Sequence, residues 1–486
     1  MRQEPRAPER LRQPRRHPAV APLVRALRPL VRGLRAAATP LARPLRRRLW
    51  RLGPLAWWRT LRWAAGVVRR IAARRRDRRL SVAVDVDAFW EPLTGVGWYL
   101  YRLVEHLARR DDLVLRLYGG SLVRAPGVAE PEVALPEGPA VERVVYEVPD
   151  GLSIPRPLLV RWVHALSPLL LAADGNDVAF APNYLLPPRF RWVRAPLVAT
   201  VHDLAVRRVP WAVRPDTAAA MRRVLDRTLF EADRLITPSR AVRDELIAGG
   251  EASPARVHAI HHGLGQAEGP ANDVEAEAGG DGDGPDPERR GVGDRTAGRP
   301  YVLAVGTLEP RKNLSVLIEA VRRLQGGPAE GLDLVLVGRF GWRAEGLRRE
   351  VAAGTAAGWL RHSGYVSGEE LARLYRGALL VALPSLYEGF GLPAVEAMAA
   401  EVPVVLSDIP VFHEVAGDAA LYAPPDDPDA WAERISRLAA DPDLRRAIVR
   451  SGRERARRYT WERSAEEHAH VFRLAARRAR AAPRPL

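Results

Sequence analysis

Short apolar runs alternate with longer amphipathic stretches along most of the chain. A short apolar run bounded by glycine, proline or polar residues is typical of a buried parallel strand, and apolar residues spaced i, i+3, i+4, i+7 predict a helix. The pattern predicts strands at 81–89, 177–183, 196–201, 233–239 and 257–260, then at 301–306, 332–338, 362–366, 378–383 and 402–406. With helices between them, the sequence predicts an α/β protein of two doubly wound, Rossmann-like domains facing a cleft.

The two sets of strands are separated by a stretch of different composition. Residues 266–299 are mainly Gly, Asp, Glu and Pro with almost no large apolar side chains, which is typical of a disordered acidic linker. We therefore expect an N-terminal domain over 80–265 and a C-terminal domain over 300–460. Residues 461–486 are expected to form a final helix. A chain of 486 residues with 47% apolar residues is long enough for two full-sized cores.

Residues 1–79 form a basic arm. They contain 24 arginines and three acidic residues, a net charge of +21, whereas the whole chain carries +17, so the remainder is mildly acidic. On a helix with about 100° per residue, the segment 57–72 separates into an apolar face and an arginine face. The apolar face holds Trp57, Leu61, Ala64, Ala65, Val68, Ile71 and Ala72. That pattern is typical of a helix lying in a membrane interface, so we expect the arm to bind an anionic membrane surface. The alternative is a disordered polycation that contacts nucleic acid nonspecifically and has no need of the tryptophans.

The composition also limits the cellular location of the protein and the kinds of chemical site that it can contain. There is no cysteine, which excludes disulfides, thiolate metal sites and a cysteine nucleophile. We find no secretory signal pattern and no run of about 18 uncharged apolar residues that would predict a membrane span. We expect a cytoplasmic protein held peripherally at the inner face of the cell membrane, with no specific nucleic acid partner. Lys312 is the only lysine among 75 basic residues, which indicates a position where a compact ammonium is needed.

The segment Leu383-Pro-Ser-Leu-Tyr-Glu-Gly-Phe-Gly-Leu-Pro-Ala-Val-Glu-Ala-Met398 carries the strongest candidate chemistry. A strand end, two glycines and a proline in the first turn of a helix predict a loop that offers backbone N–H groups to a phosphate. These amides are those of Gly389, Phe390, Gly391 and Leu392. Glu388 is placed to grip sugar hydroxyls, and Glu396, one helical turn in, to accept both hydroxyls of a ribose. The alternative is an ordinary strand–loop–helix joint with two solvated glutamates.

Other candidates follow predicted strands, where functional residues of open α/β sheets gather. His202 follows the strand 196–201, although a histidine there equally suits a turn cap. Gly95 and Gly97 open a helix after the first strand and predict another anion-approach loop. Arg311 and Lys312 begin a helix after the strand 301–306, where they could neutralise a leaving pyrophosphate.

The pair Glu388 and Glu396 resembles the E-x7-E signature of the family 4 retaining glycosyltransferases, which have the GT-B fold. The resemblance covers roughly residues 80–475 in consistent order. It implies that Gly95 and Gly97 border the donor phosphates, and that His202 in Thr-Val-His-Asp-Leu approaches the donor sugar. It further implies diphosphate binding by Thr307, Arg311 and Lys312, and a nucleotide base near Tyr365. Some members have an arginine where this chain has Thr307. In GT-B folds the last helix, here roughly 461–477, crosses back onto the first domain.

The resemblance implies transfer of a sugar, mannose or a related hexose, from a nucleotide-diphosphate sugar to a glycan or lipid-linked acceptor, as in polysaccharide biosynthesis. GDP-mannose is one candidate donor, and neither a cofactor nor a metal is expected. Three alternatives stay open: a non-catalytic scaffold of the same fold, a polyanion-binding protein, and a nucleotide-sugar epimerase. The presence of Glu388, Glu396, Arg311, Lys312 and His202 together favours the enzyme.

Overall fold

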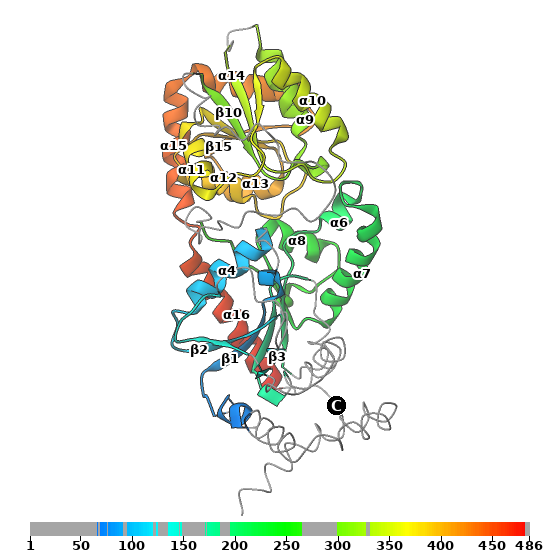
Figure 1. Ribbon diagram of the computed structural model, residues 1–486, viewed down its shortest axis with the longest axis vertical. Coiled ribbons are helices and arrows are strands. Elements are labelled where there is room, and N and C mark those ends of the chain that lie inside the picture. The colour runs from blue at the N-terminus through cyan, green and yellow to red at the C-terminus, as the bar shows by residue number, and fades with distance from the viewer. Residues whose placement is uncertain are drawn as a thin grey trace, which may run out of the picture.

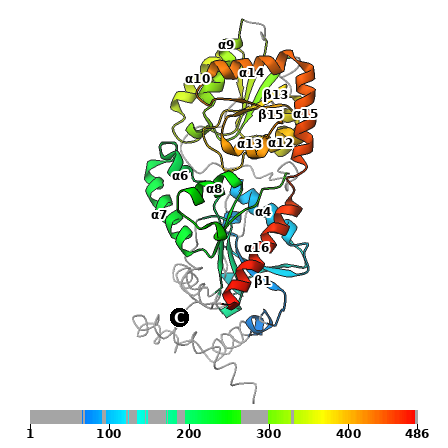
Figure 2. The same cartoon turned by 180° about the vertical axis from the view of Figure 1, so that it is seen from behind.

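The chain folds into two stacked α/β domains, as Figures 1 and 2 show from opposite sides. The computed structural model describes residues 66, 69–74, 76–90, 95–119, 123–124, 135–144, 146–147, 171, 173–184, 195–264, 299–326 and 331–481. The expected linker 266–299 and most of the expected arm, including Trp57, lie outside them, apart from Arg299.

The N-terminal domain is built on a seven-stranded parallel sheet with strand order β4-β2-β1-β6-β7-β8-β9. The strands are β1 (Leu80–Asp85), β2 (Leu113–Tyr118), β4 (Val141–Arg143), β6 (Val178–Ala181), β7 (Leu197–Thr200), β8 (Arg234–Thr237) and β9 (Val257–Ala259). The described helices are η1 (Asp87–Trp90), α4 (Gly95–Leu107), α6 (Ala205–Arg208), η3 (Pro210–Ala212), α7 (Pro215–Glu231), α8 (Arg240–Ala248) and η4 (Pro254–Arg256). Two short strands, β3 (Val123–Arg124) and β5 (Tyr146–Glu147), pair separately.

The C-terminal domain has a six-stranded parallel sheet with order β12-β11-β10-β13-β14-β15. Its strands are β10 (Tyr301–Val305), β11 (Asp333–Val337), β12 (Leu360–His362), β13 (Leu380–Leu383), β14 (Val404–Ser407) and β15 (Ala420–Ala423). The helices that follow in order are η6 (Pro310–Lys312), α9 (Leu314–Leu324), α10 (Glu345–Ala356), α11 (Gly368–Gly377), α12 (Leu392–Ala399), α13 (Pro410–Ala416), α14 (Pro428–Ala440), α15 (Pro442–Ala456) and α16 (Trp461–Ala481). Two Rossmann-like parallel-sheet domains are therefore confirmed.

The last helix, α16, packs on the N-terminal domain. It leaves the C-terminal domain and runs down the N-terminal domain beside α4 (Figures 1 and 2). Trp461, Ala469 and Phe472 join the core cluster formed by one face of the first sheet. The rings of Phe472 and Phe180 have centroids 5.1 Å apart. Because α16 is shared in this way, the two domains are connected by a packed helix as well as by the segment 265–298.

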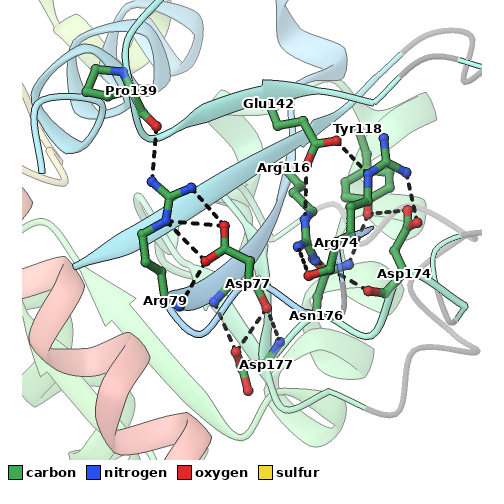
Figure 3. Close-up of polar contacts among 11 residues, drawn as sticks. Arg74, Asp77, Arg79, Arg116, Tyr118, Pro139, Glu142, Asp174, Asn176 and Asp177 are labelled. Carbon is green, nitrogen blue, oxygen red and sulfur yellow. Dashed lines mark hydrogen bonds and ion pairs between the residues drawn. The ribbon is translucent and has the colours of Figure 1, made fainter. Parts of the chain in front are cut away.

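Strand β2 was not predicted from the pattern, because Arg116 interrupts its apolar run. The whole strand is nevertheless buried, and Arg116 is only 1% exposed. Figure 3 shows how the charge is accommodated: the guanidinium donates to Glu142 Oε2 (3.2 Å) and Asn176 Oδ1 (3.1 Å). A buried arginine needs such partners, since an unpaired buried charge is strongly destabilising.

The same cluster fixes the end of the basic arm to the domain. Arg74 is 7% exposed and forms ion pairs with Asp174 (2.8 Å) and Glu142 (2.6 Å) (Figure 3). Its carbonyl oxygen accepts a hydrogen bond from Arg116 (2.8 Å). The division at Leu80 between arm and domain stays a prediction, but a truncation there would remove Arg74, whose guanidinium is paired with the fully buried Asp174.

No described helix is both long enough and apolar enough to pass through a bilayer.

Candidate active site

The site forms around the loop between β13 and α12, at the carboxyl ends of the C-terminal strands. Gly391 has a φ of 88°, and a Cβ there would lie 2.6 Å from the ring of Phe412, so only glycine fits. A Cβ at Gly389 would clash with the carbonyl oxygen of His202, at the end of β7 in the other domain. Ser239 donates a hydrogen bond to the carbonyl of Gly389 (2.7 Å). The glycine loop therefore closes directly against the N-terminal domain.

Glu388 lies at the centre of a charged cluster inside this loop. Its carboxylate accepts from Lys312 Nζ (2.5 Å), Arg311 (3.0 Å) and Ser385 Oγ (2.7 Å), and the residue is 9% exposed. Burial by itself would raise the pKa of Glu388, but Lys312 and Arg311 bring it down to about 2. Glu388 is therefore ionised throughout the neutral range.

Arg311 is held from both sides. Besides Glu388 it contacts Glu309 (2.9 Å) and donates to the carbonyl oxygen of Tyr387 (3.0 Å). Burial would lower the pKa of Arg311, but the two glutamates raise it, so the guanidinium stays charged. The ion pairs of Glu388 with Arg311 and Lys312 were not foreseen from the sequence, because Glu388 was expected to meet sugar hydroxyls and the cations a phosphate.

Glu396 lies on α12, one turn into the helix. Tyr375 of α11 donates its hydroxyl to Glu396 Oε2 (2.8 Å). Burial raises the pKa of Glu396, and the tyrosine bond only partly opposes that. Tyr375 was missed in the sequence because it falls in a helix with no motif, 21 residues before its partner.

His202 forms the N-terminal half of the site. Its Nε2 lies 2.8 Å from the carbonyl oxygen of Pro182, which requires a proton on Nε2 and leaves Nδ1 as the acceptor nitrogen. Burial lowers the pKa of His202, so the ring is neutral at pH 7. Its ring meets the ring of Tyr99 edge-on, with centroids 4.7 Å apart.

Tyr99 in turn is held by a buried chain of hydrogen bonds. His468 Nδ1 donates to the carbonyl oxygen of Ser464 (2.7 Å), so Nε2 accepts from the Tyr99 hydroxyl (2.8 Å). The same hydroxyl oxygen accepts from Thr200 (3.1 Å). Burial lowers the pKa of His468 to about 4, which keeps this arrangement neutral. The final helix thus reaches the strand that carries His202.

The remaining predicted residues lie around this centre. Gly95 and Gly97 begin α4, the helix that carries Tyr99. Thr307 is exposed, in the turn before η6. Tyr365 is 66% exposed, and the guanidinium of Arg339 lies 5.2 Å from its ring centroid. The structure brings together Arg311, Lys312, Glu388, Gly389 and His202, and among the described residues no hydrogen bond joins these five to Thr307 or Tyr365.

A second contact joins the domains beside the glycine loop. Glu414 of α13 accepts hydrogen bonds from the backbone N–H groups of Arg240 and Ala241 (2.8 Å each). These amides open α8, where a carboxylate is favoured by the helix dipole. His261 Nε2 lies 2.7 Å from the same carboxylate. No group of three or more described His, Asp or Glu side chains has the arrangement of a metal site.

Comparison with known proteins places this geometry in a family. The family described as Glycosyl transferases group 1 matches residues 286–455, and the family described as Glycosyltransferase Family 4 matches residues 93–265. The O-antigen chain mannosyltransferase B of Escherichia coli is 31% identical over 79% of this chain and 97% of that protein. A D-inositol 3-phosphate glycosyltransferase of Salinispora arenicola is 29% identical over 84% of this chain and 94% of its own length. In fold, the chain is similar to the sucrose-phosphate synthase of Thermosynechococcus elongatus (TM-score 0.60, 24% identity, 82% of this chain and 99% of that one).

Proposed function

The chain belongs to glycosyltransferase family 4 and is a GT-B glycosyltransferase, and we propose that it moves a hexose from a nucleotide-diphosphate sugar to a glycan or lipid-linked acceptor with retention of configuration. The observation that carries the proposal is the meeting of Arg311, Lys312 and the Gly389 loop with His202 across the two domains. Mannose is the first candidate sugar, and GDP-mannose the first candidate donor, because of the similarity to the E. coli O-antigen mannosyltransferase.

In the proposed reaction the bond between the anomeric carbon and the β-phosphate oxygen breaks, and negative charge develops on the nucleoside diphosphate. Arg311, Lys312 and the amides from Gly389 to Leu392 stabilise that charge electrostatically. The acceptor hydroxyl attacks from the face that the diphosphate leaves, and its proton passes to a phosphate oxygen. Glu388 is paired with two cations, which makes it a poor covalent nucleophile and favours this front-face route.

The other residues take binding roles in the proposal. Glu396 accepts the ribose hydroxyls, with Tyr375 fixing its second oxygen. His202 offers Nδ1 to a hydroxyl of the donor sugar, and its neutral state suits a hydrogen-bond acceptor. Tyr365 packs near the base, Thr307 borders the diphosphate, and Gly95 and Gly97 border the donor phosphates. The cations and amides supply the charge that a divalent metal would otherwise provide, so we propose a metal-independent reaction.

The decisive experiment is a panel of nucleoside diphosphates and nucleotide sugars in a thermal-shift assay, followed by product analysis. A ligand at 100 times its Kd should stabilise the protein by about 2.7 kcal/mol. Glu396→Ala should lose most of that shift, whereas Glu433→Ala on the exposed side of α14 should keep it. NMR of the new anomeric proton then reports retention. Binding without transfer would indicate a scaffold, and a changed configuration of the free donor would indicate an epimerase.

We also propose that residues 1–79 hold the enzyme at an anionic membrane surface, on the cytoplasmic side where nucleotide sugars are made. The proposal rests on the charge of +21 and the clustered tryptophans. Replacing Trp57, Trp58 and Trp63 with Ser should weaken binding to anionic vesicles even at low salt. Unchanged binding, or a preference of the arm for DNA over lipid at equal salt, would contradict it.

A further inference from the structure

One aromatic side chain of the C-terminal domain lies inside the core of the N-terminal domain. Tyr387 precedes Glu388 in the loop between β13 and α12, and it is 9% exposed. It belongs to a hydrophobic cluster whose other buried members all lie between Ala83 and Val257. Tyr387 therefore crosses the boundary between the domains, directly beside the charged cluster of the candidate site.

The hydroxyl group of Tyr387 is bound as an acceptor and as a donor. It accepts a hydrogen bond from the backbone N–H of Leu204 (3.0 Å) and donates one to Glu245 Oε2 (3.2 Å). Burial and the nearby Glu245 raise the pKa of Tyr387, so the hydroxyl keeps the proton that it donates. Glu245 is held in turn by Arg208, whose Nε lies 3.1 Å from the same oxygen. A phenylalanine would pack in the same place but would make neither hydrogen bond.

The position of Leu204 connects this contact to the candidate site. Leu204 follows His202 by two residues and immediately precedes α6, so its N–H has no partner within that helix. Asp203 accepts a hydrogen bond from the next amide, that of Ala205 (2.9 Å). Figure 1 shows α6 and α8 at the end of the N-terminal domain that faces the C-terminal domain. The Tyr387 hydroxyl therefore fixes the end of the segment 202–204 from across the domain boundary.

The main chain of the same residue is bound to the charged cluster. The carbonyl oxygen of Tyr387 accepts a hydrogen bond from Arg311 Nη1 (3.0 Å). The carbonyl oxygen of Arg311 accepts one from the N–H of Leu386 (2.9 Å). Because the ring between the two bound ends of Tyr387 is rigid, this residue sets the separation between Arg311 and the segment that carries His202.

We propose that Tyr387 is a positioning residue for the transfer reaction, and that it holds His202 at the distance from Arg311 that the bound donor requires. In the proposed mechanism Arg311 stabilises the diphosphate and His202 contacts the sugar of the same donor molecule. A change in their separation would leave one of these contacts unmade in the transition state. Tyr387 acts through these neighbours and not through contact with the donor. The role in turnover rests on the proposed transfer reaction, whereas the hydrogen bonds of Tyr387 do not.

The first test compares two variants that each lose one buried tyrosine hydroxyl. Tyr387→Phe removes the bonds to Leu204 and Glu245. Tyr301→Phe removes the bond to the carbonyl oxygen of Leu374 (2.7 Å), at the start of β10 and away from the carboxyl end of that strand. Both variants should have a lower Tm, but only Tyr387→Phe should lose kcat, by about tenfold. The Kd of the free nucleoside diphosphate should not change in either variant, because the carbonyl of Tyr387 still holds Arg311.

A double-mutant cycle tests whether Tyr387 acts through His202. In a protein that already carries His202→Ala, adding Tyr387→Phe should change kcat by less than about twofold, although Tm should still fall. The same loss of kcat in both backgrounds, or no loss in Tyr387→Phe alone, would overturn the proposal. If Tyr387→Phe does not fold, Glu245→Ala removes the acceptor and leaves the ring, and its kcat should fall about threefold. Glu245→Gln keeps an acceptor oxygen and should retain the wild-type kcat, so equal kcat values for Glu245→Ala and the wild type would then overturn the proposal.

Hydrogen exchange distinguishes the contact from the reaction. The amide of Leu204 should exchange faster in Tyr387→Phe than in the wild type or in Tyr301→Phe, and this measurement requires no transfer of sugar. Faster exchange with an unchanged kcat would restrict Tyr387 to a structural contact and would overturn the positioning role. A wild-type protein that transfers no sugar would contradict the proposed function, and the positioning role with it, without altering the exchange result.

Discussion

The two halves of the candidate site differ in whether the side chains that form them are charged or neutral. The C-terminal half concentrates ions: Arg311 and Lys312 are bound to Glu388, with Glu309 behind them. Around Tyr99 the N-terminal half presents neutral groups: His202 and His468 have lowered pKa values, the ring of His202 meets the Tyr99 ring edge-on, and His468 is hydrogen-bonded to the Tyr99 hydroxyl. A diphosphate needs strong electrostatic stabilisation, whereas sugar hydroxyls are recognised by neutral donors and acceptors. Each domain therefore provides the electrostatic environment that one part of the proposed donor needs.

The largest effect is expected at the centre of the charged half. Glu388→Gln leaves Arg311 and Lys312 without their shared carboxylate, so both lose their orientation toward the diphosphate. We expect turnover to fall about 10²–10³-fold, as when one transition-state donor is removed, with a smaller loss of nucleoside-diphosphate affinity. Steady-state kinetics and calorimetry with the free nucleotide would measure the two. Equal losses of turnover and nucleotide affinity would contradict a role of Glu388 in turnover.

Glu388 also gives a pH prediction. Its pKa is lowered to about 2 in the folded protein, so its stabilising contribution is present above the unfolded pKa of about 4.3 and is lost as the pH falls from there toward 2. Wild type and Glu388→Gln should therefore differ in Tm at pH 7 and converge toward pH 2. A constant difference across that range would show that the carboxylate charge is not what matters.

The next-largest effect is expected at Lys312. It tests whether the C-terminal half of the site needs the compact charge of an ammonium group. Lys312 Nζ is 2.5 Å from Glu388 Oε1, and the lysine side chain is only 15% exposed, whereas a guanidinium is wider than an ammonium and meets a carboxylate as a planar fork. Lys312→Arg keeps the net charge, yet we expect turnover to fall by about 10- to 100-fold. Arg322→Lys, on the exposed face of α9, is the matched control. If the Lys312→Arg variant turns over at the wild-type rate, an ammonium group is not required at this position.

A smaller effect is expected in the neutral half. Tyr99→Phe keeps the ring against His202 but leaves His468 and Thr200 without their shared hydroxyl, at a cost of about 1–3 kcal/mol. We expect kcat/KM for the donor sugar to fall about tenfold, with nucleoside-diphosphate affinity unchanged. Tyr101→Phe, on the same helix and half-buried, should behave like the wild type. A drop in Tm without a change in kcat/KM would restrict Tyr99 to a structural role.

The smallest effect concerns the contact that holds the two halves together. Burial would raise the pKa of Glu414, but His261 and the two amides of α8 lower it, so this contact is complete at pH 7 and weakens as the pH falls below the ordinary glutamate range. Glu414→Gln should cost about 1 kcal/mol and increase hydrogen exchange at residues 240–242. If exchange there is unchanged at pH 7, Glu414 does not hold the domains closed.

The alternating pattern of the chain determined the two parallel sheets, because buried parallel strands need continuous apolar runs and crossover helices need an amphipathic face. Local sequence also placed the glycine loop, since Gly391 has a conformation and a neighbour that only glycine tolerates. The strand β12 ends at His362 rather than at 366, because Gly364 turns the chain with a φ of 63° and exposes Tyr365. Patterns among residues close together in the sequence were therefore sufficient to predict elements and loops, but not the exact residue at which each element ends.

Which side chains meet depends on the packing of elements that are distant in the sequence. Tyr99 and His468 are 369 positions apart, and Arg74 and Asp174 are 100 apart. No local pattern in the sequence identifies such pairs, because each of these residues fits its own helix or strand equally well whichever residue it contacts. Strand β2 was missed for the same reason. A charged residue within an apolar run predicts an exposed position, and the sequence does not show that Glu142 and Asn176 lie beside Arg116. A buried polar group is stable only with its partners in place, and in this protein those partners come from elements that the sequence alone does not bring together.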